Sequence, residues 1–428
     1  MNGQAVSAAR LPLYALALAR RYWAPLLCVH TVGVFLHWAV LRGMVLLERV
    51  DPVAALAGLS VAVLTTLTAT IVMLHLLVPG LPTLQAELLA RRARGVRSAT
   101  LAERERRVVD AIATAVLPFL LLYSAWGMFA EEYRRYAVEL INHSGIQAYT
   151  DQLQIDALGP PLVAALVCLA GRVVVERLYH RGGAPGLGVL TALFEANWMF
   201  FAVFSVVRLT DQARQWVASR AVVAELHDAA ADLVALAGDL TGLPLGAACA
   251  ALFALVSGGW EQLKDAVLEP LMWLAIVAVI FGAEIDRAEA VLRGDARAAR
   301  VRAATRRLPR PLRGVAGITA RDLREKYAPF LNAIRFVLRV GPVFFLTLCL
   351  CHVLLEAAEG WLRRGVHLVV GPHDFLGWWW QWLEPLAFAT GALHEVLRVC
   401  LLAAAFELAL RALAGHSVGR RVRPAPAG

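Results

Sequence analysis

Long runs of mostly apolar residues are the feature of this sequence that most constrains its fold. A helix needs ~20 apolar residues to cross the hydrocarbon core of a bilayer, within a range of ~17–25. Eight runs reach this length, namely 22–47, 54–78, 108–130, 157–175, 187–209, 270–286, 329–357 and 385–410. Because backbone polar groups in lipid must be satisfied within their own segment, such runs are predicted to be helical. The sequence therefore predicts an all-α, polytopic integral membrane protein with eight transmembrane helices.

Composition supports this class. Hydrophobic residues make up 59% of the 428 residues and charged residues only 18%, whereas soluble domains contain about 45–50% and about 25%. Of the 42 basic residues only Lys264 and Lys326 are lysine, which indicates a GC-rich coding sequence. We therefore expect the plasma (inner) membrane of a bacterium, and we expect no nucleic-acid partner.

Charge in the connecting segments predicts the orientation. With a cytoplasmic N-terminus, the inner segments hold 28 basic and 8 acidic residues, and the outer segments hold 8 basic and 18 acidic residues. Cytoplasmic loops of membrane proteins carry the excess of Lys and Arg. Both termini are therefore predicted to be cytoplasmic. Eight of the twelve tryptophans then lie at or beyond the outer helix ends, as in an aromatic belt.

A ninth apolar run, 243–259, is predicted not to span. If it did, the segment 287–328 with its twelve basic residues would lie outside, against the charge rule. The run contains Pro244, Gly246, Gly258 and Gly259. We expect it to form a re-entrant or interfacial helix, which is tolerated where it is buried in protein or lines a cavity.

The predicted spans form four hairpins within a single membrane domain, at 22–78, 108–175, 187–286 and 329–410. Three returning spans begin near an acidic residue followed by proline: Asp51-Pro52, Glu269-Pro270 and Glu384-Pro385. This pair suits a helix N-terminus, where proline removes no needed hydrogen bond and the carboxylate faces the positive end of the dipole. We treat the pattern as a candidate internal repeat.

The segments outside the spans have distinct characters. An outer helical insertion is expected over 210–269, because apolar and acidic residues alternate with helical spacing from Asp211 to Ala237. A basic cytoplasmic linker is expected over 287–328, where the stretch from Arg287 to Arg313 should bind anionic lipids. Residues 11–19 are expected to lie on the membrane surface. A flexible cytoplasmic tail is expected over 411–428.

Ionisable and polar residues inside the spans are candidates for function, because their burial in lipid is unfavourable. Glu395 and Arg398 are three residues apart and can pair on one helix face. Arg335 and Arg339 share a face, and their expected acidic partners are Glu284, Glu395 or Glu407. The full candidate set is His394, Glu395, Arg398, Glu407, Arg335, Arg339, Glu284, Arg172, Glu195 and Asn197. These side chains either fix helix packing or line a water-filled vestibule.

Sequence signatures of enzymes and cofactor sites are absent. The sequence His394-Glu395-x-x-Arg398 lacks the second imidazole of a zinc protease. The six cysteines have no Cys-x-x-Cys spacing. No phosphate loop or nucleophile elbow occurs. We therefore expect no catalytic residue, no metal and no cofactor.

Three functional classes remain open. The first is a channel or transporter for a small solute or ion, with the buried charges along its path. The second is a non-catalytic membrane subunit or scaffold that docks a partner membrane protein or forms a homo-oligomer. The third and weakest is an enzyme for lipid-linked substrates, in which the outer pair Glu131-Glu132 would serve.

Overall fold

A computed structural model describes residues 10–93, 119, 128–153, 159–182, 185–241, 245–282 and 340–421. All elements in these residues are helical, as predicted, and these residues contain no strand. In chain order the elements are α2 (Leu11–Glu48), α3 (Pro52–Leu77), the 3-10 turn η1 (Val78–Gly80), α4 (Pro82–Ala93), α6 (Met128–Leu153), α7 (Pro160–Gly182), α8 (Pro185–Ala218), α9 (Ala221–Thr241), α10 (Leu245–Leu263), the π-helix η2 (Lys264–Leu268), α11 (Glu269–Gly282), α15 (Pro342–Val370), the π-helix η3 (Phe375–Trp379) and α16 (Trp380–Arg421).

Three of these helices are long and apolar enough to cross a membrane. They are Leu11–Glu48, Pro52–Gly80 and Pro342–Val370, which overlap the predicted spans 22–47, 54–78 and 329–357. Length and composition thus support three of the eight predicted spans in the described residues. Most of the predicted span 108–130 lies outside those residues.

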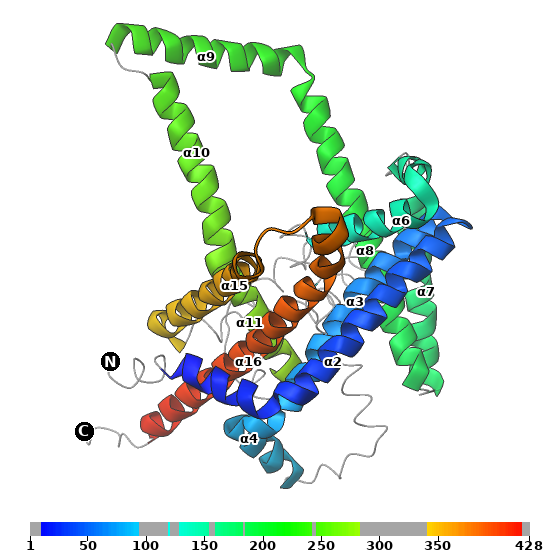
Figure 1. Cartoon of the computed structure of the whole chain (residues 1–428), viewed down its shortest axis with the longest axis vertical. Helices are drawn as coiled ribbons and strands as arrows, with labels where there is room; N and C mark the ends of the chain where they lie inside the picture. The colour runs from blue at the N-terminus through cyan, green and yellow to red at the C-terminus, as the bar shows by residue number, and fades with distance from the viewer. Residues whose placement is uncertain are drawn as a thin grey trace, which may run out of the picture.

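Neighbouring helices pack as antiparallel pairs. α2 lies along α3, α7 lies along α8, and α15 packs on α16, which also crosses α2 (Figure 1). Small residues permit the close approach of α2 and α3: a Cβ atom added at Gly33 would lie 2.8 Å from the Cβ of Ala69. Such small contacts are typical of helix pairs in membranes, where packing rather than water exclusion drives association.

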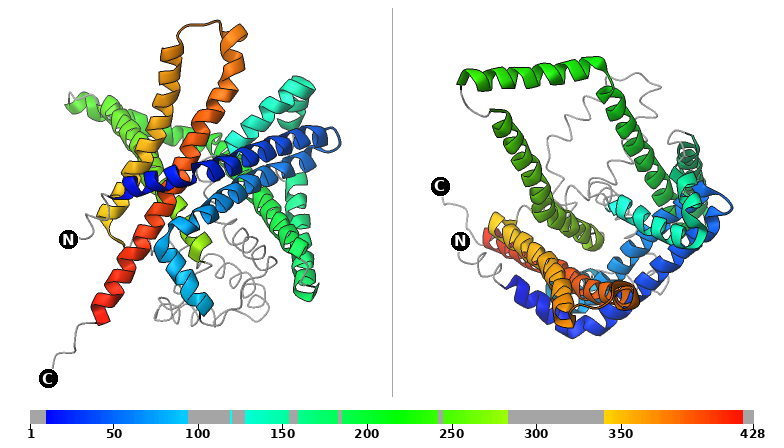
Figure 2. Two further views of the ribbon diagram at one scale, coloured as in Figure 1. Left: turned by 60° about the horizontal axis from the view of Figure 1, so that its bottom comes forward. Right: turned by 45° about the horizontal axis from the view of Figure 1, so that its top comes forward.

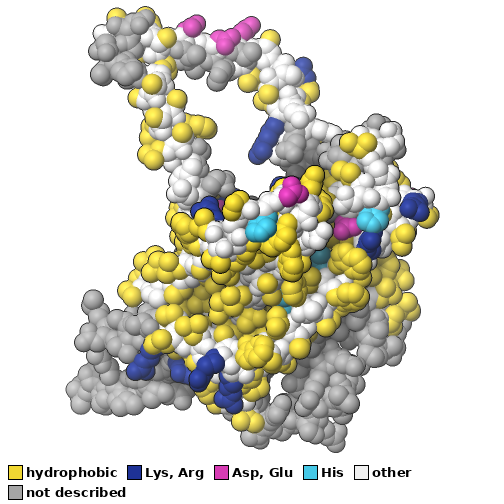
Figure 3. Space-filling model, in the orientation of Figure 1, with side chains coloured by type: hydrophobic (Ala, Val, Ile, Leu, Met, Phe, Trp, Pro, Cys, Tyr) yellow, Lys and Arg dark blue, Asp and Glu magenta, His cyan; other side chains and the backbone are white. Residues whose placement is uncertain are grey.

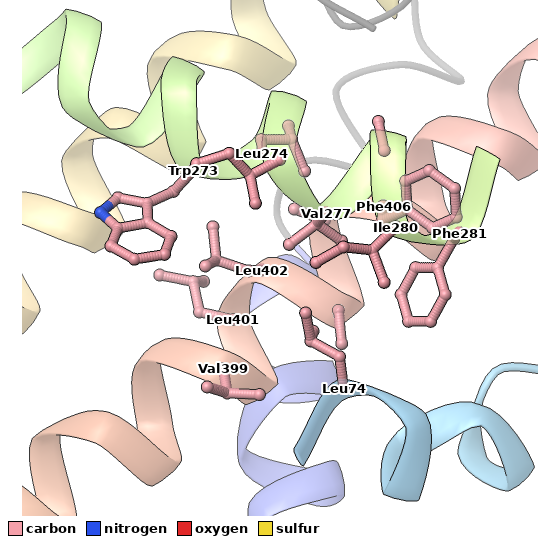
Figure 4. Close-up of a cluster of buried hydrophobic side chains, with 14 of the residues drawn as sticks. Leu74, Trp273, Leu274, Val277, Ile280, Phe281, Val399, Leu401, Leu402 and Phe406 are labelled. Atoms are coloured by element: carbon pink, nitrogen blue, oxygen red, sulfur yellow. The ribbon is translucent and has the colours of Figure 1, made fainter. Parts of the chain in front are cut away.

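The buried core centres on α11 and the second half of α16. All nine residues from Trp273 to Phe281 are buried, so α11 is enclosed on every side. Its side chains pack against Leu401, Leu402 and Phe406 of α16 (Figure 4). A helix that is apolar all round and buried all round is a central element of a bundle.

The outer faces of the bundle are strongly apolar. Large hydrophobic side chains on α2 and α15, among them Phe35, Trp38, Leu346 and Leu350, are exposed. Yellow hydrophobic side chains cover the middle of the face in Figure 3, and the charged side chains lie mostly above it and along its lower edge. This distribution matches a surface solvated by lipid rather than by water.

Segments predicted to lie on one side of the membrane gather at one end of the bundle. In Figure 1 the α2–α3 and α15–α16 connections, α6 and α9 lie towards the top. The first turns of α2, α4, the end of α16 and the α7–α8 connection lie towards the bottom of the same view. Which end faces the cytoplasm stays a prediction from loop charge.

The predicted outer insertion is helical but differs in shape from the expectation. Ser219 and Arg220 interrupt the expected amphipathic helix over 211–237, so its first part belongs to α8 and the rest forms α9. α8, α9 and α10 form an arch that stands away from the bundle (Figures 1 and 2). The run 243–259 does not turn back as a re-entrant segment would, because α10 continues through η2 into α11.

An acidic residue followed by proline predicts the start of α3 correctly, but at the other two positions the preceding residues are already helical. Asp51 caps α3 as predicted, since its Oδ1 accepts a 2.8 Å hydrogen bond from the Ala54 N–H. Pro270 instead follows η2 within the rod formed by α10 and α11, and Pro385 lies inside α16. Both helices continue through the proline, and the π-helices η2 and η3 that precede them are the local adjustment common at such interruptions.

Two other predicted boundaries shift. Residues 11–19 and the first span form one helix, α2, which contains Pro25 and bends along its length (Figure 1). Proline inside a helix causes such a kink. Gly341, with φ of 121°, starts α15, which continues to Val370 and so extends 13 residues beyond the predicted end at 357. The expected tail from 411 is helical as far as Arg421.

Candidate polar site between α15 and α16

One face of α15 carries four polar side chains in the middle and outer half of the helix. His352, Glu356, Glu359 and Arg363 are spaced by four, three and four residues, which places them in one row along a helix. α16 contributes His394, Glu395 and Arg398 opposite this row. We call these seven residues the α15–α16 polar cluster.

His394 lies between two carboxylates of α15. Its Nε2 atom is 3.1 Å from Glu356 Oε1, and its Nδ1 atom is 3.1 Å from Glu359 Oε2. The His394 side chain is 11% exposed and Glu356 is 48% exposed. The imidazole is therefore enclosed, while the carboxylate of Glu356 remains open to the surroundings.

His352 extends the row towards the bundle interior. Its Nε2 atom is 3.9 Å from Glu356 Oε1 and 3.9 Å from Glu269 Oε1 of α11. The side chain is 1% exposed, and neither ring nitrogen makes a hydrogen bond. Imidazole and carboxylate groups thus alternate from Glu269 through His352, Glu356 and His394 to Glu359.

Two arginines flank this row. The predicted pair between Glu395 and Arg398 forms, with 2.6 Å between Oε2 and Nη2. The Arg398 guanidinium also lies 4.1 Å from the centre of the Trp273 ring of α11, a stabilising cation–π distance. On α15, Arg363 pairs with Glu359 and donates a 3.1 Å hydrogen bond to Thr390 Oγ1 of α16.

The cluster occupies the middle of a helix that can span a bilayer. Glu356 is 14 residues from each end of Pro342–Val370, which corresponds to ~21 Å in either direction. Charged groups at this depth are unfavourable by ~2.5–3.5 kcal/mol each on insertion scales. Their concentration on two facing helices makes this cluster the candidate functional site.

Two other predicted candidates, Arg172 and Glu195, meet in a second place, and Asn197 lies on the same helix as Glu195. Arg172 of α7 lies 3.9 Å from Glu195 Oε2 of α8 and 3.7 Å from Glu176 Oε2 of α7. Asn197 donates a 3.0 Å hydrogen bond to the Leu193 carbonyl of its own helix. Because Arg172 and Glu195 are buried and lie on adjacent helices, this group fits the packing interpretation.

Glu407 has a structural position away from the polar cluster. Its carboxylate accepts hydrogen bonds from the N–H groups of Thr83 at 2.7 Å and Leu84 at 3.1 Å, in the first turn of α4. Arg411 donates to the same carboxylate at 2.9 Å. Glu407 thus caps another helix, satisfying N–H groups that lack partners within it.

The remaining predictions lie outside the described residues. They concern Arg335, Arg339, Glu284 and the lipid-binding stretch from Arg287 to Arg313. The pairing of Arg335 or Arg339 with Glu395 or Glu407 therefore stays a prediction.

The outer acidic pair is held in ion pairs. Glu132 lies 3.1 Å from His37 Nε2 of α2, and Glu131 lies 3.2 Å from Arg134 Nη1. Nearby, Tyr136 donates a 2.9 Å hydrogen bond to Glu48, and burial together with this carboxylate raises the pKa of Tyr136. The contacts of Glu132 and Tyr136 fasten α6 to α2, whereas the pair of Glu131 and Arg134 lies within α6.

Sequence reasoning missed Glu356, Glu359 and His352. The signal was the spacing His-x-x-x-Glu-x-x-Glu from 352 to 359, which places three ligand-type side chains on one face. The predicted span ended at 357, so Glu359 was assigned to an outer segment and the row was divided.

Chemically, the polar cluster can hold a cation between carboxylate oxygens and imidazole nitrogens. It has no hydroxyl or thiol nucleophile positioned by an imidazole among its seven residues. Comparison of the chain with protein-family models, with curated proteins and with solved structures finds no match.

Proposed function

We propose that this protein is a polytopic membrane protein that transports a small ion or solute past the α15–α16 polar cluster. One observation carries the proposal: a row of alternating carboxylates and imidazoles lies at the middle of a helix long enough to span. Glu356, at the centre of the row, is open to the surroundings, while His352 and His394 on either side of it are enclosed.

Eight spans with cytoplasmic termini are part of this proposal. Three helices of suitable length and composition support it, as does the grouping of connecting segments at two ends of the bundle (Figure 1). We also propose a bacterial inner membrane and contact of the 287–313 stretch with anionic lipids, on the basis of composition and charge.

Flux into proteoliposomes tests the transport function. The full chain is reconstituted, and uptake of protons, monovalent cations and divalent cations is followed with trapped fluorescent indicators. Arg398→Gln and Glu395→Gln should lower flux at least tenfold, because each leaves the other charge unpaired near the path. Arg364→Gln, at an exposed arginine beside Arg363, should leave flux unchanged.

Helicity and the elution volume in detergent show whether each variant is folded. Equal flux through folded wild type, Arg398→Gln and Glu395→Gln would remove this pair from the mechanism. Absence of flux for every ion tested in the wild type would contradict an ion-transport function.

A docking function is the second candidate, and the α8–α9–α10 arch favours it. Leu252, Phe253, Leu255 and Val256 of α10 are all more than half exposed. Contiguous exposed apolar surface marks contact with lipid or with another protein. A stoichiometric partner that co-purifies with the wild type, and is lost when 221–241 is replaced by a flexible linker, would favour this candidate.

A further inference from the structure

We propose that Glu356, Glu359 and His394 form a binding site for a divalent transition-metal ion, with His352 as an additional ligand. A carboxylate oxygen from each glutamate and one ring nitrogen of His394 all lie within 4.8 Å of one another. Bonds of ~2.0–2.2 Å from one ion to such atoms require only small side-chain rotations. The ligands come from two packed helices, which is how metal sites are built in the cores of helix bundles.

The state of His352 is an independent indication of a ligand. This imidazole is 1% exposed, neither ring nitrogen makes a hydrogen bond, and Nε2 is directed towards Glu356 at 3.9 Å. A buried polar group without a partner is unfavourable by about 1–3 kcal/mol, and such groups call for an explanation such as a missing ion. A cation held by Glu356 would supply the partner.

Charge in and around the cluster also favours a divalent cation. Four carboxylates lie here, those of Glu269, Glu356, Glu359 and Glu395. Among the residues that the structure describes, the guanidinium groups of Arg363 and Arg398 pair with two of them. With neutral imidazoles, which are the form that binds metal, two negative charges remain. One divalent cation balances them.

The donor set indicates the class of metal. Two carboxylates with one or two imidazoles suit first-row transition ions such as Zn²⁺, Mn²⁺ or Fe²⁺. Ca²⁺ and Mg²⁺ prefer oxygen ligands alone. Arg363 would orient Glu359 from outside the site, in the way that outer partners position metal ligands.

That this metal is the transported ion rests on the proposed function, whereas binding itself does not. Binding is therefore measured first, without flux. Full-length protein carrying an affinity tag without histidine is purified in detergent, treated with a chelator and titrated with Zn²⁺ by calorimetry. Co²⁺ is then added as a spectroscopic probe, because its visible absorption reports the geometry and type of its ligands.

The wild type should bind one Zn²⁺ per chain, and Glu356→Gln and His394→Ala should each weaken binding at least tenfold. His352→Phe, which keeps a buried aromatic ring, should shift the Co²⁺ spectrum. Glu384→Gln, at an exposed carboxylate of the same helix as His394, is the matched control and should bind as the wild type does.

The two proposals fail separately. Absence of stoichiometric Zn²⁺ and Co²⁺ binding by the wild type, or equal binding by folded Glu356→Gln and His394→Ala, would overturn the metal site even if other ions are transported. Stoichiometric Zn²⁺ binding by a protein that shows no flux would support the metal site and contradict the proposed transport function.

Discussion

Glu407 shows how one residue can join segments that are far apart in the sequence. The side chain is fully buried, yet it accepts two backbone hydrogen bonds from α4 and one from Arg411. A carboxylate in apolar surroundings is tolerated when such bonds replace water. Removing it leaves two N–H groups and a guanidinium without their common acceptor.

We predict that Glu407→Ala is strongly destabilising. Leaving a buried backbone N–H group without its acceptor lowers stability by about 1–3 kcal/mol, and the N–H groups of Thr83 and Leu84 both lose theirs. Thermal unfolding in detergent, followed by circular dichroism, should show a midpoint well below that of the wild type. Glu384→Ala, at an exposed position of the same helix, should have the same unfolding midpoint as the wild type. Equal midpoints for both variants would show that the cap adds nothing to stability.

Sequence spacing predicts contacts within a helix but not between helices. Glu395 and Arg398 are three residues apart, so their pair could be inferred from helix geometry alone. The approach of His394 to Glu356 and Glu359 depends on how α15 and α16 are rotated about their axes, which no local pattern determines. Glu407 entered the candidate set as an intramembrane charge, and the partner that explains it lies 324 residues away.

At the scale of elements, the α2–α3 pair depends on the absence of a side chain at Gly33. The added Cβ would lie 2.8 Å from the Ala69 Cβ, a separation that requires the two helices to move apart. Gly43 of the same helix has nothing within 4 Å of an added Cβ. The two glycines therefore provide a matched pair.

We predict opposite effects of alanine at these two positions. Gly33→Ala should lower the thermal midpoint despite the higher helix propensity of alanine. Gly43→Ala should leave it unchanged or raise it, since this propensity is worth up to ~1 kcal/mol. Adding Ala69→Gly should restore the stability of Gly33→Ala, because the clash is removed from the other side. Similar midpoints for Gly33→Ala and Gly43→Ala would contradict close packing here.

Proline patterns explain why helix starts were predicted unevenly. Asp51-Pro52 follows a two-residue interruption after α2, so the proline stands where no hydrogen bond is lost. Glu269-Pro270 and Glu384-Pro385 also combine an acidic residue with proline, but in both places the residues before the pair are already helical and the helix continues through it. The dipeptide therefore indicates a permitted position for proline, and only the preceding residues decide whether a helix begins there.

At the scale of the whole molecule, charge and apolar length predict far more than motifs do. The helical class follows from the apolar runs alone, whereas the sidedness derived from loop charge stays a prediction. The arrangement of the helices around α11 could not be predicted, because every apolar face is compatible with either lipid or protein. The described residues support three spans of the eight predicted by length and composition.

Labelling from each side of the membrane tests the proposed orientation. In a background without the native cysteines, we predict that Ala229→Cys in α9 reacts with an impermeant maleimide only from outside. Ala86→Cys in α4 should react only from inside; both positions are exposed in the structure. Sealed right-side-out and inverted vesicles provide the two measurements. Reaction of both cysteines from the same side would exclude the orientation.

The helices α10, η2 and α11 follow one another without a break and form one rod between the arch and the core. The rod runs from Leu245 to Gly282, a length of ~57 Å, with one end at the arch and the other enclosed in the core. A helix transmits displacement along its axis, so movement of α9 must either be absorbed within the π-helix Lys264–Leu268 or arrive at Trp273. Because Trp273 lies against Arg398, a displacement that reached Trp273 would also reach the α15–α16 polar cluster.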